Sequence, residues 1–392
     1  MTTTTATPSR SVVEARLRGA LWSFFSGDAL AAPTHWYYGG FQQVQMDYGP
    51  NGITTYTKPK MELRGSILNK SDVNGGGRSS SSSSSGKWSL FGSSSDKNNK
   101  KEQITIIGDV INHGKKPYWD KHKSIHYHAT LQRGENTLEA QLARVLMKTI
   151  VQNDGRFNAD AFRDAYVTFL QTPGSHNDTY ASTCHRMFFS NLVFSKLPPE
   201  KCPDNDGHNV DTIDGLILPT IAVLATAAAS QQPDRVETVA AQCAAVTRQS
   251  AVLEQSSRIW SRLVTASLLE EDDAAVVQQM NDCSQSWGHR RPPSANAPDQ
   301  MTACYLSQSV PALLNMIAKY MPKNDGRTGV WNALLSNANI GGENVHRGSI
   351  LGAVLGARAT YDNLPTELVQ GLHDKEQLER EIEDFVQAVM KN

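Results

Sequence analysis

Glycines spaced four residues apart at Gly348, Gly352 and Gly356 constrain the fold of this chain most. They lie in the stretch 339–357, whose apolar residues recur with helical period from Val345 onward. Glycines four apart share one face of a helix, and each costs roughly 1 kcal/mol against alanine in a helix interior. The stripe therefore predicts that another backbone packs very close to this helix.

The loop before this helix contains Gly341-Gly342, where a positive φ has no steric cost. It delivers to the first turn of the helix the polar residues Glu343, Asn344, His346 and Arg347. A helix N-terminus has unpaired N–H groups and partial positive charge, so it can bind an anion. The same residues would also serve as ordinary helix caps, and both interpretations stay open at this point.

A second stretch repeats this design, since Gly134-Glu135-Asn136-Thr137 precedes an apolar helix predicted at 138–151. Asn136 or Thr137 is a good N-cap, and capping alone would explain the polar residues. Alternatively, the two helix starts face one another across a site. In that case the carboxylates of Glu135 and Glu343 would come together.

Other polar and aromatic residues are candidates for the same site. His35 precedes the aromatic residues at 36–38, which could be a ligand wall or part of the core. His126 and His128 alternate as in an extended segment, but no third metal ligand lies near them in the sequence. A polar face on a helix predicted to begin near 176 is either solvated or part of the site; its members are Asp178, Ser182, His185 and Arg186.

The chain is predicted to be all-α, because no stretch alternates long enough for a sheet. Further helices are expected at 11–25, 160–170, 214–230, 235–250, 253–269, 274–286, 301–320 and 367–390. Residues 70–101 are rich in serine, glycine, lysine and asparagine and predict a disordered insertion. The organisation expected is a disordered lead at 1–10 and a single domain formed by 11–69 and 102–392. A regulatory role for the serine tract is a further hypothesis.

Charge and cysteine usage exclude several classes of protein. The net charge of −1 lacks the basic footprint of a nucleic-acid-binding protein. The five cysteines are scattered and never in CxxC spacing, which favours free thiols in a reducing compartment. The apolar run 216–229 is too short to span a bilayer and contains Pro219. We expect a cytoplasmic protein that contacts neither nucleic acid nor membrane.

Three motifs resemble those of the ADP-ribosylglycohydrolase family. Residues 19–33 are similar to its N-terminal signature, including Gly27-Asp28-Ala29. Gly134-Glu135-Asn136-Thr137 stands where the family has Thr-Asp-Asp-Thr, and Gly341-Gly342-Glu343-Asn344 where it has Gly-Gly-Asp-x-Asp-Thr. The resemblance covers most of the chain outside the insertion. It implies a multi-helix bundle that uses two magnesium ions to hydrolyse the bond between ADP-ribose and a protein side chain or small acceptor.

The sequence departs from these motifs where the family's metal ligands stand. His35 replaces the first-signature glutamate, and Glu135 and Asn136 replace the paired aspartates of the second motif. In the third motif Glu343 replaces the first aspartate, and Val345-His346 replaces the second aspartate and its threonine. Too few anions survive for a two-magnesium centre, because hard cations need several oxygen ligands. The pattern is most similar to a divergent branch that includes J-type crystallins and related selenoproteins.

The leading hypothesis is a hydrolase pocket for an ADP-ribose-like or other anionic nucleotide ligand. Its catalytic residues would be Glu135 or Glu343 as general base, with His346, His35 or His185 as acid or orienting partner. The ligand-binding residues would be Asp28, His35, Asn136, Asp178, His185, Gly342, Asn344 and Arg347. At most one magnesium ion would bind, between Glu135, Asn136 and Glu343. The alternative is a non-catalytic binding or structural protein, crystallin-like, on the same fold.

Overall fold

Two helices from opposite ends of the chain, α1 (Arg10–Ala31) and α12 (Val345–Ala359), pack backbone against backbone. A Cβ atom added to Gly352 would lie 2.1 Å from the carbonyl oxygen of Ser23, a separation that no side chain tolerates. The close backbone approach predicted from the glycine stripe is therefore confirmed. The computed structural model describes residues 8–75, 104–205, 210–230, 232–321 and 325–391.

Helix α1 continues beyond the end expected for it near residue 25 and stops only at Ala31. Gly27 lies inside the helix, beyond its expected end. A Cβ atom at this position would lie 2.1 Å from the carbonyl oxygen of Gly348, so the glycine serves the contact with α12 rather than a turn. As a consequence Asp28 lies on the last turns of a buried helix, with a relative exposure of 1%.

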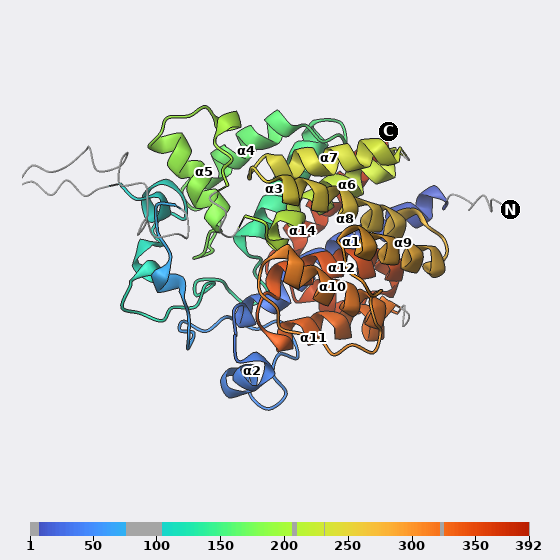
Figure 1. Cartoon of the computed structure of the whole chain (residues 1–392), viewed down its shortest axis with the longest axis horizontal. Helices are drawn as coiled ribbons and strands as arrows, with labels where there is room; N and C mark the ends of the chain where they lie inside the picture. Colours follow the sequence, from blue (N-terminus) through green and yellow to red (C-terminus); the bar gives the residue numbers. More distant parts are fainter. Residues whose placement is uncertain (1–7, 76–103, 206–209, 231, 322–324, 392) are drawn as a thin grey trace, which may run out of the picture.

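The other helices surround this central pair (Figure 1). They are α2 (Gly40–Tyr48), α3 (Leu138–Gln152), α4 (Ala159–Gln171), α5 (Thr183–Val193), α6 (Ile217–Ala229), α7 (Pro233–Ala245), α8 (Ala251–Leu269), α9 (Asp273–Ser286), α10 (Leu306–Tyr320), α11 (Asn332–Ile340), α13 (Thr366–Gln370) and α14 (Lys375–Met390). Short 3-10 and π-helical turns are η1 (Ala32–Thr34), η2 (Leu68–Lys70), η3 (Ile106–Val110), η4 (Lys116–Trp119), η5 (Pro199–Lys201), η6 (Ile213–Leu216), η8 (Gly326–Trp331) and η9 (Tyr361–Asn363).

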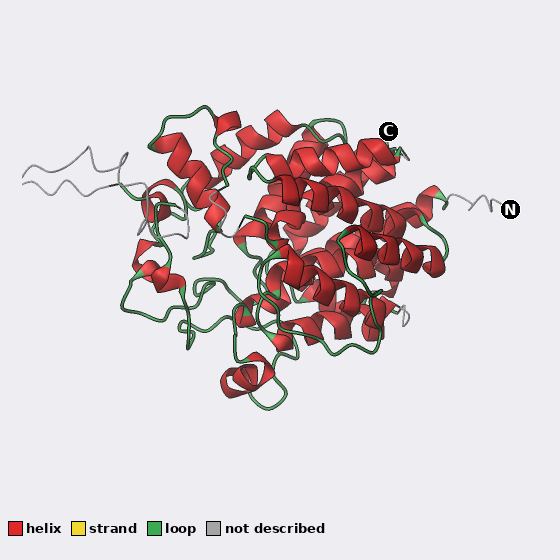
Figure 2. Cartoon of the chain, viewed as in Figure 1, coloured by secondary structure: helices red, strands yellow, loops and turns green. Residues whose placement is uncertain are grey.

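The part of the chain that the structure describes contains no β-strand, only isolated bridges (Figure 2). The prediction of an all-α, multi-helix bundle is confirmed. None of the helices in the described ranges combines the length with the apolar character that a bilayer crossing requires. The predicted lead falls outside the described residues at 1–7, and so does most of the predicted insertion, at 76–101.

Of the other differences from the expected helices, two have a clear local cause. The helix expected from residue 176 begins only at Thr183, because Asp178 accepts the backbone N–H of Tyr180 and this local bond competes with the helix. The helix expected at 367–390 is divided into α13 and α14. Gly371 lies in the break, where a Cβ atom would be 1.9 Å from the ring of Tyr56.

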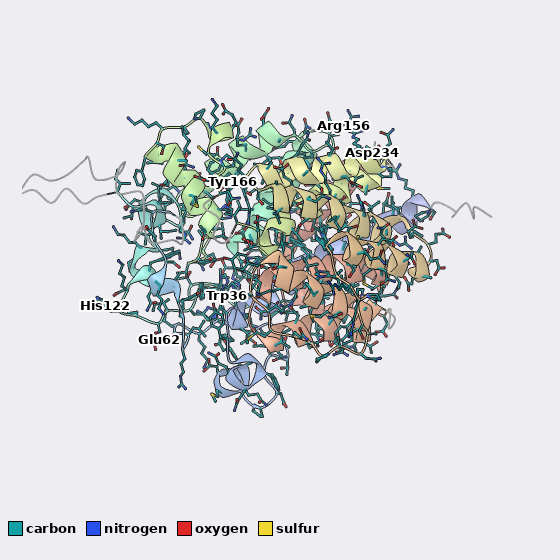
Figure 3. The ribbon with its side chains drawn as sticks, in the orientation of Figure 1. Trp36, Glu62, His122, Arg156, Tyr166 and Asp234 are labelled. Carbon is teal, nitrogen blue, oxygen red and sulfur yellow. The ribbon has the colours of Figure 1, made fainter. Side chains whose placement is uncertain are left out.

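The long loops between α2 and α3 cover one side of the helical body, on the left of Figure 1. Trp36 lies at the boundary between these loops and the helices (Figure 3). Its backbone N–H donates to the carbonyl of Gly342 at 2.9 Å, which fixes the end of α1 to the start of α12. The segment after α1 and the start of α12 therefore meet beside the loop layer.

Candidate active site

A row of buried hydrogen bonds connects the segment before α5 with the start of α12. Asp178 Oδ1 lies 2.8 Å from His128 Nδ1, and His128 Nε2 lies 2.7 Å from His35 Nδ1. His35 Nε2 lies 3.2 Å from Glu343 Oε2, and Glu343 Oε1 lies 2.5 Å from His346 Nδ1. None of the five is more than 4% exposed. We refer to His35, Glu343 and His346 as the histidine–glutamate centre.

The groups of this row share their hydrogen atoms. Burial lowers the pKa of His35 to about 4, so this imidazole is neutral at physiological pH and carries one N–H. One of its ring nitrogens therefore donates and the other accepts, toward Glu343 and His128.

Glu343 and His346 form an ion pair. Burial raises the pKa of Glu343, but the attraction of His346 and His35 outweighs burial and brings this pKa down to about 2. Burial likewise lowers the pKa of His346, and the attraction of Glu343 outweighs it and raises this pKa to about 10. Both residues are therefore charged at neutral pH, without access to bulk water.

Glu139 and Asp214 are two further acids near His346, since both help to raise its pKa. Asp214 Oδ2 accepts from Arg248 Nη2 at 2.8 Å, and Glu139 Oε1 lies 2.8 Å from His185 Nε2. Neither acid is among the residues predicted for the site. Their places in the sequence offered one indication, because Glu139 lies in the first turn of an apolar helix and Asp214 lies just before another.

A cavity of about 30 Å³ opens beside the histidine–glutamate centre. It is lined by Trp36, Tyr180, Ser182, Thr183, Thr212, Asp214, Cys304, Glu343 and His346. This volume suffices for about one water molecule. Two carboxylates, a charged imidazole and two aromatic rings thus face one small space.

Asp28 and Asp178 serve the N-terminus of α3. Asp28 Oδ1 accepts from the backbone N–H of Thr137 and from the amide of Asn136, both at 2.8 Å. Asp178 Oδ2 accepts from the backbone N–H of Leu138 at 2.8 Å. Thr137 stands at the N-cap without a side-chain capping bond of its own, so distant acids satisfy the helix start instead. Asp28 and Asn136, predicted to bind ligand, are engaged in this contact.

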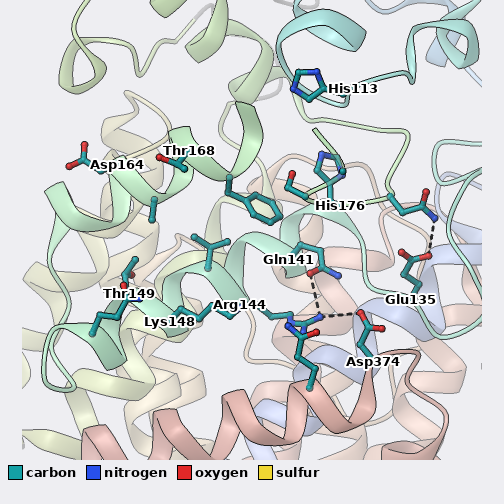
Figure 4. Close-up of a pocket in the computed structure, with 18 of the residues that line it drawn as sticks. His113, Glu135, Gln141, Arg144, Lys148, Thr149, Asp164, Thr168, His176 and Asp374 are labelled. Carbon is teal, nitrogen blue, oxygen red and sulfur yellow. Dashed lines mark hydrogen bonds and ion pairs between the residues drawn. The ribbon is translucent and has the colours of Figure 1, made fainter. Parts of the chain in front are cut away.

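Glu135 lies away from the histidine–glutamate centre. Its Oε2 accepts from the backbone N–H of Gln132 at 2.6 Å and from the amide of Asn177 at 3.1 Å. It faces an open polar groove of about 860 Å³ between α3, α4 and the start of α14 (Figure 4). Among the described residues, the linings of the groove and of the cavity at Glu343 have no member in common.

Among the described residues, Glu135 and Glu343 thus share neither a hydrogen-bond partner nor a cavity, which is not the arrangement that their predicted convergence requires. The physical reason is local, because the Glu135 side chain folds back onto the N–H of Gln132 in its own loop. The magnesium site expected between Glu135, Asn136 and Glu343 stays a prediction that this arrangement does not support.

The remaining predicted residues lie next to the centre but face protein partners. Gly341 and Gly342 have φ values of 69° and 65°, in agreement with the positive φ expected there. Asn344 donates to the hydroxyl of Thr34 at 2.8 Å. His185 bonds to Glu139 and Tyr166 and does not line the cavity.

Arg347 is fully buried at the start of α12. Its Nε donates to Asn337 Oδ1 at 2.8 Å and its Nη1 to Thr302 Oγ1 at 3.0 Å, while Nη2 has no hydrogen-bond partner. Burial lowers the pKa of this guanidinium to about 10. A phosphate would reach Arg347 only after the segment at Thr302 moved.

The residues present do not fit the magnesium pair that the resemblance implies. Mg²⁺ requires several available oxygen ligands. Both oxygens of Glu343 are bonded to imidazoles, and Asp28, Asp214 and Glu139 are held by α3, Arg248 and His185. Within the described ranges, the group whose ligand atoms could converge on one ion is the histidine–glutamate centre, and its two nitrogen donors disfavour magnesium.

Comparison with known proteins relates this geometry to a family. A family model described as ADP-ribosylglycohydrolase matches residues 9–392. A solved structure titled "ADP-ribosylglycohydrolase-related protein complex" is similar with a TM-score of 0.55 and 15% sequence identity, covering 97% of this chain and 100% of that one. At this identity the likeness concerns the fold alone. No curated protein matches this chain.

Proposed function

The chain belongs to the ADP-ribosylglycohydrolase family, and from this membership we propose that it hydrolyses a glycosidic bond of an ADP-ribose-like ligand at the cavity beside Glu343. One observation carries the proposal. The cavity is lined by two carboxylates, Glu343 and Asp214, together with the imidazole of His346. A pair of carboxylates around an oxocarbenium-like transition state is the usual arrangement in glycoside hydrolysis.

The charge states of these residues support distinct roles. The pKa values of Glu343 and Asp214 are both lowered despite burial, by His346 and by Arg248 respectively, so both carboxylates are ionised and can stabilise positive charge at the anomeric carbon. A water in the cavity attacks that carbon and gives its proton to Glu343. His346 gives a proton to the departing nitrogen or oxygen as the glycosidic bond breaks. Glu343 gains one proton from the water and His346 loses one to the leaving group, so the net charge of the pair is unchanged.

Aromatic residues next to the cavity supply a surface for the flat parts of such a ligand. Trp36 lines the cavity and stacks on Tyr38 with ring centroids 5.8 Å apart, and Tyr38 is 45% exposed. Rings of this kind bind bases by stacking. The sequence left it open whether the aromatic residues at 36–38 belong to the core or to a ligand wall. Trp36 and Tyr38 are suited to the ligand wall.

The phosphate contact proposed for Arg347 and for the N–H groups after Gly342 requires a movement. Met301 and Thr302 cover Gly342, since a Cβ atom there would lie 2.4 Å from Met301 Cγ. We propose that this segment, which lies between α9 and α10, swings away when the ligand binds. Arg347 Nη2, buried without a hydrogen-bond partner, then has a phosphate oxygen to donate to.

A second candidate function is a non-catalytic, crystallin-like protein on the same fold. The specific observation in its favour is that each carboxylate of the buried cluster already has hydrogen-bond partners, while the cavity measures only about 30 Å³. The similarity of the substituted motifs to the branch of J-type crystallins and related selenoproteins points the same way.

The test combines binding with turnover. The full chain is titrated with ADP-ribose by calorimetry and incubated with proteins ADP-ribosylated on arginine or serine, and released ADP-ribose is measured. We expect release that falls at least about 100-fold in Glu343→Gln and in Asp214→Asn. The matched control, Glu135→Gln, should keep full activity, because this glutamate faces the groove. Neither binding nor release by the unmodified chain would favour the non-catalytic protein, and full activity of Glu343→Gln would refute the site.

A further inference from the structure

The donor atoms of the histidine–glutamate centre are those of a transition-metal site. We propose that His35, Glu343 and His346 bind one divalent ion of the zinc class, with a coordination position open toward the cavity. The family resemblance implies magnesium bound by oxygen atoms, so this site is a different one in both ion and ligands. Two imidazole nitrogens and one carboxylate suit Zn²⁺, Co²⁺ or Fe²⁺ and do not suit Mg²⁺.

The three side chains lie near enough to one another to share an ion, and one pair of ligand atoms already has the spacing of a loaded site. Their ligand atoms all lie within 4.8 Å of one another. The rings of His35 and His346 are nearly perpendicular, at 83°, with centroids 5.3 Å apart, so both can turn a nitrogen toward one point. In a tetrahedral site with bonds of about 2.0–2.1 Å, neighbouring ligand atoms are about 3.3 Å apart. His35 Nε2 and Glu343 Oε2 are already 3.2 Å apart.

A second layer of residues orients the first ligand. Metal-binding histidines almost always use their other ring nitrogen in a hydrogen bond that fixes ring and tautomer. His35 Nδ1 lies 2.7 Å from His128 Nε2, and His128 Nδ1 lies 2.8 Å from the carboxylate of Asp178. This arrangement leaves His35 Nε2 aimed at Glu343. A buried polar core would need no such second row, because its groups only have to satisfy one another.

The cavity provides the open position. Glu343 and His346 both line it, together with Asp214, and its volume of about 30 Å³ suits a single water. Three protein ligands and a water are the usual set of a catalytic zinc site. The ion would take the place of the proton between His346 and Glu343 and of any hydrogen on His35 Nε2, and each displaced proton would go to solvent. With the ion bound, Glu343 and His346 would be ligands and no longer base and acid. The ion would supply water activation and charge stabilisation, whereas Asp214 would keep its role toward the sugar.

Cobalt tests this site without reference to turnover. The full chain is stripped by dialysis against a chelator and titrated with Co²⁺, whose visible bands report coordination by nitrogen and oxygen ligands. We expect saturation at one ion per chain, competition by Zn²⁺ and no competition by an excess of Mg²⁺. The bands should be lost in Glu343→Gln and His346→Gln. They should persist in His113→Gln, a control that removes a half-buried imidazole at the groove.

Each outcome of this titration either supports or overturns the proposed metal site. The absence of Co²⁺ bands from the unmodified chain overturns the inference, whether or not any variant folds. Bands that survive in both Glu343→Gln and His346→Gln overturn it as well. X-ray absorption of the Zn²⁺-loaded chain should show scattering from two imidazole rings, and a shell of oxygen alone contradicts the assignment. Co²⁺ binding without hydrolysis would support the metal site and refute the proposed function. Hydrolysis by the stripped chain without Co²⁺ binding would support the proposed function and refute the metal site.

Discussion

The histidine–glutamate centre and the groove at Glu135 start from the same three residue types, Gly-Glu-Asn before a helix, and end in different chemistry. Glu343 is 1% exposed and both its oxygens bond to imidazoles. Glu135 is half-buried and accepts from the N–H of Gln132 and the amide of Asn177. The difference comes from the neighbouring elements, since the segment after η1 brings His35 against Glu343 and α12 itself supplies His346, whereas Glu135 lies beside an open groove.

The largest difference between the two helix starts is expected in stability, when the charge of Glu343 is removed. Glu343→Gln leaves the imidazolium of His346 buried without its counter-charge, which should lower the free energy of unfolding by about 3–5 kcal/mol. The double variant Glu343→Gln/His346→Gln should recover part of this loss, because no uncompensated charge remains. Urea unfolding of both variants and the parent checks this. Equal stability of the single variant and the parent would show that the pair is not ionised.

The same pair predicts how stability depends on pH. The folded-state pKa of His346 is raised to about 10, from 6.5, so its contribution is complete below pH 6.5 and is lost as the pH rises toward 10. The folded-state pKa of His35 is lowered to about 4, so stability also falls as the pH drops from 6.5 toward 4. We expect losses on the order of a few kcal/mol on the alkaline side. In His346→Gln the free energy of unfolding should no longer fall on the alkaline side, whereas its fall on the acid side should remain. Urea unfolding across the pH range measures both.

How much of this contrast the sequence could predict depends on the range of the interactions. The glycine stripe predicted the backbone contact of α12, because spacing along one helix is local information. The all-α class followed in the same way from helical periods. The ion pair of Glu343 and His346 was within reach, since the two are three residues apart.

The sequence could not place residues that meet only through the fold. His128 reaches His35 across 93 positions and Asp28 caps α3 across 109, and no local pattern encodes such contacts. The sequence predicted a distant partner for Glu135, whereas its side chain accepts a hydrogen bond from the backbone N–H of Gln132 nearby. Two helix starts with the same residue types can therefore have different surroundings.

The metal site proposed for the histidine–glutamate centre predicts a further difference from the groove, in the stability gained when Zn²⁺ binds. Zn²⁺ at about 100 times its dissociation constant should raise the free energy of unfolding by about 2.7 kcal/mol, because the ion binds the folded chain only. The rise in melting temperature should vanish in His346→Gln and remain in His113→Gln. An equal rise in all three proteins would indicate binding elsewhere on the chain.

The smallest effect is expected at the groove, and it decides whether the two helix starts are independent. Glu135→Gln keeps an oxygen acceptor for the N–H of Gln132 and removes only a charge that faces water, so unfolding should change by less than about 1 kcal/mol. Hydrolysis and Co²⁺ binding should stay at the parental level. A loss of either would mean that Glu135 acts on the centre through Asn177 and Asp178, which are adjacent in the chain. Asn177→Ala should then reproduce the loss, whereas under independence it lowers stability alone.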